Sequence, residues 1–133
     1  MKFITVEHFQ EQPKEVQEVL LDWWNCEPHD IYAWVMDTKG NKWCIESCSN
    51  QIQADTINKG KAVDFCIPLF TEGQIRRFIE DKLDMKIQCE IHPLTLDYIV
   101  LVKNNSGNKV WIHTGKEDLL QAYWKVACMI VKE

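Results

Sequence analysis

The residues of this sequence best suited to recognising a ligand are its tryptophans, of which the chain has six. Core packing explains Trp23 and Trp124, whereas Trp24, Trp43 and Trp111 have no evident place in an apolar face. Trp24 lies at the rim of a helical apolar stripe, and Trp111 alternates with two aliphatic neighbours. An exposed indole can stack on a nucleobase or pack against a protein partner. These three tryptophans are therefore candidate ligand-binding residues.

Arg76 and Arg77 are the basic side chains best placed to act with them, because both fall in the first turns of a predicted helix. A guanidinium group can hold a phosphate or a carboxylate. Glu80 and Asp81 follow at helical spacing, so salt bridges on a solvated face explain the two arginines as well. We favour this ordinary explanation and keep both arginines as candidate ligand-binding residues.

Cysteines offer the next chemistry, since Cys44 and Cys48 could join Cys26 and His29 around a zinc ion. A structural zinc site needs four ligands. On a strand, however, Cys44 and Cys48 lie about 13 Å apart, and the sequence lacks a paired CxxC pattern. We therefore expect ordinary reduced thiols and no cofactor, and we keep a zinc-stabilised interaction module as an alternative.

Catalysis is the less favoured interpretation. The four histidines are scattered, although His92 and His113 are expected to be neighbours on one sheet. No P-loop, dinucleotide-binding motif, HExxH motif or carboxylate pair is present. A small enzyme that uses a Cys–His pair remains the alternative to a binding protein.

The charge distribution limits the class of partner. The net charge is −5, and residues 1–37 hold eight acids against two lysines. General nucleic-acid binding needs a basic footprint and is therefore unlikely. The sequence has no apolar run of about 18 residues and no apolar N-terminal segment, so we expect no membrane span, no signal peptide and a cytoplasmic location.

Three helices are expected to position these residues. The best specified begins at Thr71, which forms a capping box with Gln74, and runs to Leu83. An earlier helix begins near Pro13 and carries an apolar stripe up to Trp24. The last follows a second capping box at 114–117 and has a broad apolar face to residue 131.

Six segments read as strands. They cover 30–37, 42–48, 62–70, 85–92, 96–103 and 109–113, and 49–61 reads as a surface loop. The first two form a hairpin across which Trp34 and Trp43 are expected to meet. The fold class is therefore α+β, with a largely antiparallel sheet of about five to six strands, three helices and the order α-ββ-β-α-βββ-α. Residues 1–133 are expected to form a single domain.

Three stretches resemble segments of small uncharacterised phage and prophage proteins of Gram-positive bacteria. They are PLFTEGQIRRFIEDK at 68–82, DLLQAYWKVAC at 118–128 and VLLDWW at 19–24. The first matches an LxTEGQLxxFIEDK pattern, and the second a DLLxAYWxxxC ending. The resemblance implies a phage origin and a life in the bacterial cytoplasm, where small phage proteins often act in host takeover or counter-defence.

The favoured function is therefore that of a non-enzymatic phage accessory protein that acts by binding. One version sequesters a nucleotide-derived immune signal, and another blocks a host protein. The apolar faces of three helices also exceed what one sheet can cover, so we expect a homodimer or a higher symmetric oligomer.

Overall fold

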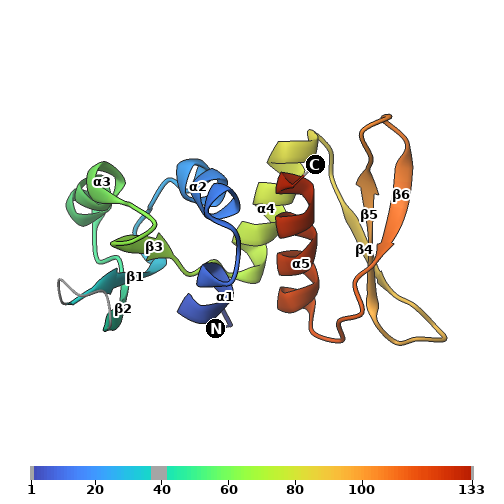
Figure 1. Cartoon of the computed structure of the whole chain (residues 1–133), viewed down its shortest axis with the longest axis horizontal. Helices are drawn as coiled ribbons and strands as arrows, with labels where there is room; N and C mark the ends of the chain where they lie inside the picture. The colour runs from blue at the N-terminus through green and yellow to red at the C-terminus, as the bar shows by residue number, and fades with distance from the viewer. Residues whose placement is uncertain (1, 37–41, 133) are drawn as a thin grey trace. The chain divides into compact units, whose positions relative to one another are not determined.

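The computed structural model describes residues 2–36 and 42–132. Its elements, in chain order, are α1 (Val6–Gln10), α2 (Lys14–Trp23), β1 (Ile31–Val35), β2 (Trp43–Ser47), α3 (Gln51–Gly60), β3 (Cys66–Pro68), α4 (Glu72–Leu83), β4 (Gln88–Ile91), β5 (Tyr98–Lys103), β6 (Lys109–His113) and α5 (Leu119–Val131) (Figure 1). The α+β class and the antiparallel strands are confirmed. The strands form two three-stranded sheets rather than one, with orders β2-β1-β3 and β4-β5-β6.

The chain divides into two compact units, each with its own sheet. The first unit is Ile4–Phe70, and the second combines Met1–Phe3 with Thr71–Glu133. In the part of the chain that the structure describes, no helix is both long and apolar enough to cross a membrane.

Two helices were not predicted, which corrects the expected number from three to five. Thr5 begins α1 with a capping box to His8. The segment expected to be a loop contains α3, in which Asn50 is the N-cap and accepts a hydrogen bond from the Gln53 N–H at 2.9 Å. Only Ala54 and Ile57 of α3 are buried, so its apolar periodicity is too weak to identify a helix.

The first unit corrects the expected tryptophan pair. Trp34 lies opposite Cys44, and Trp43 lies opposite Val35. Directly opposed residues share a face and consecutive residues alternate, so Trp34 and Trp43 point to opposite faces. The turn expected between these strands lies outside the described residues. The third predicted strand is shorter than expected and spans only Cys66–Pro68.

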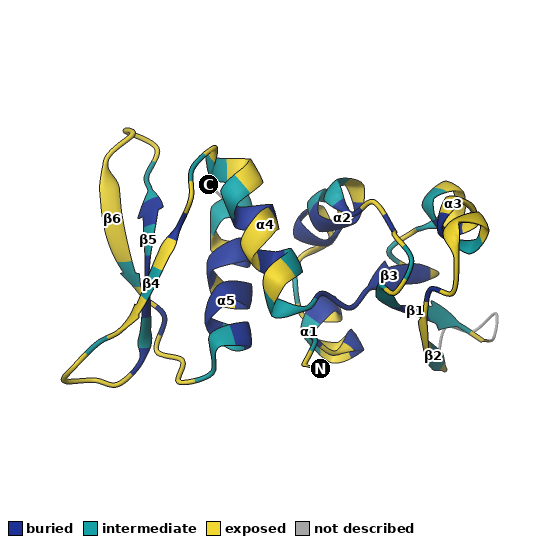
Figure 2. Ribbon diagram, turned by 180° about the vertical axis from the view of Figure 1, so that it is seen from behind, coloured by how far each residue is buried: buried dark blue, intermediate teal, exposed yellow. Residues whose placement is uncertain are grey.

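In the second unit, helices α4 and α5 pack together on one side of the sheet (Figure 1). The capping box of Thr71 and Gln74 at the start of α4 is confirmed. Helix α5 begins one turn later than its predicted cap, because Asp118 and not Thr114 accepts from the backbone N–H of residue 121. Figure 2 shows most of α5 as buried and most of β6 as exposed.

The face of the second sheet opposite the helices carries its own pattern. Val100 is fully buried on the helix side, where Ile112 lies opposite it. Trp111 and His113 lie opposite Leu101 and Ile99 and therefore belong to the other face. No helix or strand of the described second unit covers that face.

Candidate functional site

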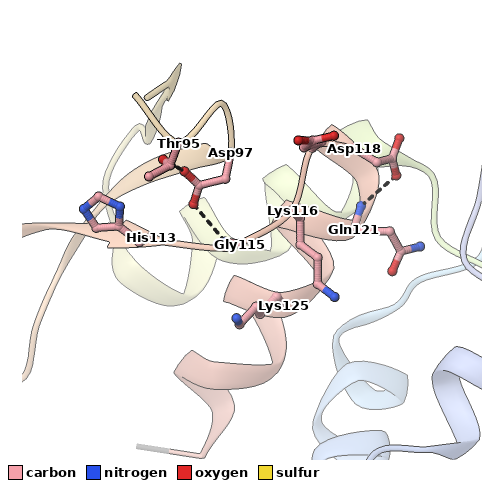
Figure 3. Close-up of a pocket in the computed structure, with 9 residues that line it drawn as sticks. Thr95, Asp97, His113, Gly115, Lys116, Asp118, Gln121 and Lys125 are labelled. Carbon is pink, nitrogen blue, oxygen red and sulfur yellow. Dashed lines mark hydrogen bonds between the residues drawn. The ribbon is translucent and has the colours of Figure 1, made fainter. Parts of the chain in front are cut away.

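The second unit contains a pocket of about 670 Å³ where β6 leads into α5 (Figure 3). Its lining consists of Thr95, Asp97, His113, Gly115, Lys116, Glu117, Asp118, Gln121 and Lys125. These residues come from the β4–β5 turn, the end of β6, the β6–α5 connection and the first two turns of α5. Polar and charged side chains therefore dominate the lining.

A buried threonine fixes the floor of this pocket. The Thr114 hydroxyl donates to the Tyr98 carbonyl at 2.6 Å and accepts from the Lys116 N–H at 3.1 Å. Gly115 follows with a φ of 68°, a left-handed conformation that a residue with a Cβ adopts at a cost. The connection is thus held in one shape, and it presents the Gly115 N–H and the Lys116 side chain to the pocket.

Asp97 is the buried acid of the pocket, with 7% of its surface exposed. Its Oδ1 accepts from the Thr95 hydroxyl, and its Oδ2 accepts from the Gly115 N–H at 2.9 Å (Figure 3). These hydrogen bonds, that of Thr95 above all, hold the pKa of the Asp97 carboxyl below its ordinary value. Asp97 therefore acts as an internal brace that joins the β4–β5 turn to the β6–α5 connection.

Asp118 is also engaged within the unit. It accepts from the Gln121 N–H as the N-cap of α5, and its other oxygen pairs with Lys2 at 3.1 Å. These bonds hold the pKa of Asp118 below its ordinary value, in spite of the opposing effect of burial. Two of the three acids of the pocket thus already have partners.

The lysines retain capacity to bind a ligand. Lys125 donates one hydrogen bond to the Thr114 carbonyl at 2.8 Å, which leaves further donors on its ammonium group. Lys116 is exposed and forms no ion pair with a side chain in residues 2–36 or 42–132. The pocket therefore offers two cationic groups, together with Gln121 and the exposed Glu117 as polar partners.

The predicted neighbourhood of His92 and His113 is confirmed. Their ring centroids lie 5.3 Å apart with an angle of 54° between the planes. His92 Nδ1 accepts from the backbone N–H groups of Leu94 and Thr95, which fixes its ring on the β4–β5 turn. His113 lines the pocket, so the pair forms its border.

Trp111 extends this border along β6. It precedes His113 by two residues on the same face of the strand, a separation of about 7 Å. Its side chain is 39% exposed. One aromatic surface therefore runs from Trp111 to His113 and ends at the two pocket lysines.

Arg76, a predicted ligand-binding residue, instead holds the second unit together. Its guanidinium group donates to the Ile87 carbonyl at 3.0 Å, and the Ile87 N–H donates to Glu80 at 3.0 Å. Arg76 and Glu80 also pair across one helical turn at 3.6 Å, as the salt-bridge interpretation predicted. Arg77 lies exposed on α4. Neither arginine lines the pocket.

The two other candidate tryptophans belong to the first unit. Trp24, expected at the rim of its helix, is only 2% exposed, and its indole N–H donates to Asp30 at 3.2 Å. The Lys61 ammonium lies 6.0 Å from its ring and caps α2 through the Leu21 carbonyl. Trp24 is therefore a core residue, and its predicted exposure was wrong. Trp43 lies half-buried on β2.

The cysteines show no sign of activation. Burial raises the pKa of Cys66 to about 11 and that of Cys128 to about 12, and it also raises the pKa of Cys26 and Cys89. A nucleophilic thiol needs the opposite shift. Within the described ranges, no group of three or more His, Cys, Asp or Glu side chains is arranged to hold a metal ion.

Comparison of the chain with protein-family models, curated proteins and solved structures gives no match. The structure itself defines an α+β chain of two units, one of which carries a polar pocket with two lysines beside an aromatic strip.

Proposed function

We propose that the protein acts by binding, without catalysis, a small anionic ligand of the nucleotide class in the pocket at the β6–α5 connection. One observation carries the proposal. Asp97 and Asp118 are engaged by groups of the same unit, whereas Lys116 and Lys125 keep donors that point to no protein carboxylate among the described residues. A ligand phosphate supplies the acceptors that these ammonium groups need.

The aromatic strip supports the nucleotide class over a simple anion. Trp111 and His113 lie on one face of β6, and His113 reaches the pocket. A nucleobase stacked on an aromatic side chain contributes about 1–3 kcal/mol. A phosphate at the lysines and a base on Trp111 would use both features together.

A sequestering role fits both this site and the resemblance to phage proteins. A protein that removes a nucleotide-derived immune signal needs affinity and no turnover. Catalytic use of a Cys–His pair is disfavoured because burial raises the pKa of the thiol groups named above.

The test is to identify what the protein retains from a bacterial cell. Protein purified under native conditions is denatured, and the released small molecules are examined by ultraviolet absorbance and mass spectrometry. We expect a nucleotide-like molecule, and a Lys116→Gln variant purified in parallel to release much less of it. Release of no phosphorylated compound, together with no stabilisation by a panel of mono- and dinucleotides, would contradict the proposal.

A further inference from the structure

The sheet of the first unit has one protected edge and one open edge. At the β3 edge, Ala62 forms a bridge to Cys66 and Pro68 ends the strand, so little of the edge can pair. At the other edge lies β2, and no further strand accompanies it in the described residues. Natural edge strands are commonly blunted by Lys, Pro or a bulge. Strand β2, with the sequence WCIES, has none of these.

The hydrogen bonds of β2 show which of its backbone groups remain available. The Met36 N–H donates to the Lys42 carbonyl, and the Cys48 N–H donates to the Asp30 carbonyl, each within 2.9 Å. Even-numbered residues of β2 therefore bond to β1, and by alternation the odd-numbered ones face away from it. Trp43, Ile45 and Ser47 thus present three N–H and three C=O groups at the open edge.

The side chains beside this edge are apolar on one face. Trp43 and Ile45 share the face of Val35 and Ala33, which lie opposite them on β1. Ile45 is 54% exposed, whereas Ala33 is fully buried. The exposed apolar surface therefore gathers at the open edge of the sheet.

From this edge we propose that β2 pairs antiparallel with β2 of a second copy of this chain, on a two-fold axis at Ile45. In that register Ile45 lies opposite the partner subunit's Ile45, and Trp43 lies opposite the partner subunit's Ser47. All three outward-facing residues of each strand then exchange both backbone hydrogen bonds. The two isoleucines meet on the apolar face, and each Trp43 reaches them diagonally.

The charges select this second copy and this register. Glu46 is the only charged residue of β2, and it faces the partner subunit's Cys44 when the axis passes through Ile45. A shift of the axis to residue 46 would place the two Glu46 carboxylates opposite each other, which is destabilising. A two-fold interface uses the same patch twice, so a self-complementary strand is what it requires.

Cysteine cross-linking tests the pairing residue by residue. In a Cys44→Ser background, Ile45→Cys should form a covalent dimer on mild oxidation, because opposed Cα atoms of a hydrogen-bonded pair lie about 5.5 Å apart. Ser47→Cys is the matched control, since its two copies would lie about 14 Å apart. The Cys44→Ser parent shows the background from the other thiols.

Light scattering over a range of concentrations gives the second measurement. We expect a mass of twice the 15.7-kDa chain for the unmodified protein and a single chain for Ile45→Lys. Ile52→Lys, at an exposed position on α3, should remain dimeric. A single-chain mass at every concentration would overturn the proposal. So would a dimer that survives Ile45→Lys, or one that cross-links equally through residues 45 and 47.

Discussion

The imidazole rings of His92 and His113 lie 5.3 Å apart, although strand β5 runs between the strands from which they come. The two side chains reach each other across the uncovered face of the sheet, beside the pocket. Their roles differ, because His92 accepts two backbone hydrogen bonds and His113 lines the pocket.

We therefore predict opposite consequences for the two histidines. His92→Leu removes the acceptor for the Leu94 and Thr95 N–H groups and should lower the free energy of unfolding by about 1 kcal/mol. His113→Leu should leave stability nearly unchanged and weaken ligand binding. Chemical denaturation and a binding titration of both variants check this. Equal loss of stability in the two variants would contradict the assigned roles.

Asp97→Asn should reveal a pH-dependent brace. The pKa of Asp97 is lower in the folded protein, so its carboxylate stabilises the fold above the unfolded-state value of about 4 and loses this effect as the pH falls. The difference in melting temperature between the unmodified protein and Asp97→Asn should be largest near neutral pH and shrink in acid. Glu117→Gln, which removes an exposed pocket charge, is the control. A difference that does not depend on pH would show that Asp97 is not held ionised.

Glu80→Ala tests the connection between α4 and the start of the second sheet. Glu80 accepts from the Ile87 N–H, and Ile87 is only 2% exposed. Loss of this acceptor leaves a buried donor unsatisfied, so the variant should lose about 1–3 kcal/mol of stability. Asp81→Ala, next to it on the exposed side of α4, should cost less. Similar losses for the two variants in urea denaturation would argue against this role of Glu80.

Thr71→Ala should cost about 1 kcal/mol, the usual effect of removing an N-cap. The Thr71 hydroxyl accepts from the Gln74 N–H at 3.4 Å, and the Gln74 side chain accepts from the Thr71 N–H at 2.9 Å. Thr71→Ser keeps the hydroxyl and should recover most of the loss. An unchanged denaturation midpoint for Thr71→Ala would show that the cap adds nothing to stability.

Local signals explain which parts of the fold the sequence predicts. The capping box at Thr71 and the strand Lys109–His113 depend on neighbouring residues and agree with the structure. Helix α3 was missed because it buries only Ala54 and Ile57, and the pairing of Trp34 with Trp43 failed because it depends on a register set by the whole hairpin.

The pocket was missed for a similar reason. Thr95 and Gly115 read as turn residues, yet nothing local indicates that the two turns meet through Asp97. The burial of Trp24 also depends on distant residues, namely Asp30 and Lys61. The proximity of His92 and His113 was predictable, because it follows from the order of an antiparallel meander.

The measurement that tests the proposed function most directly is a calorimetric titration of Lys116→Gln with the nucleotide retained by the protein, or with the best ligand of the nucleotide panel. Lys116 forms no ion pair with the described side chains, so its loss should leave the melting temperature unchanged. We predict a loss in affinity of about tenfold, which corresponds to about 1.4 kcal/mol. The matched control is Lys86→Gln, at a side chain that is 92% exposed and does not line the pocket. It should bind like the unmodified protein. Equal affinities for all three proteins would contradict the assignment of the pocket as the binding site.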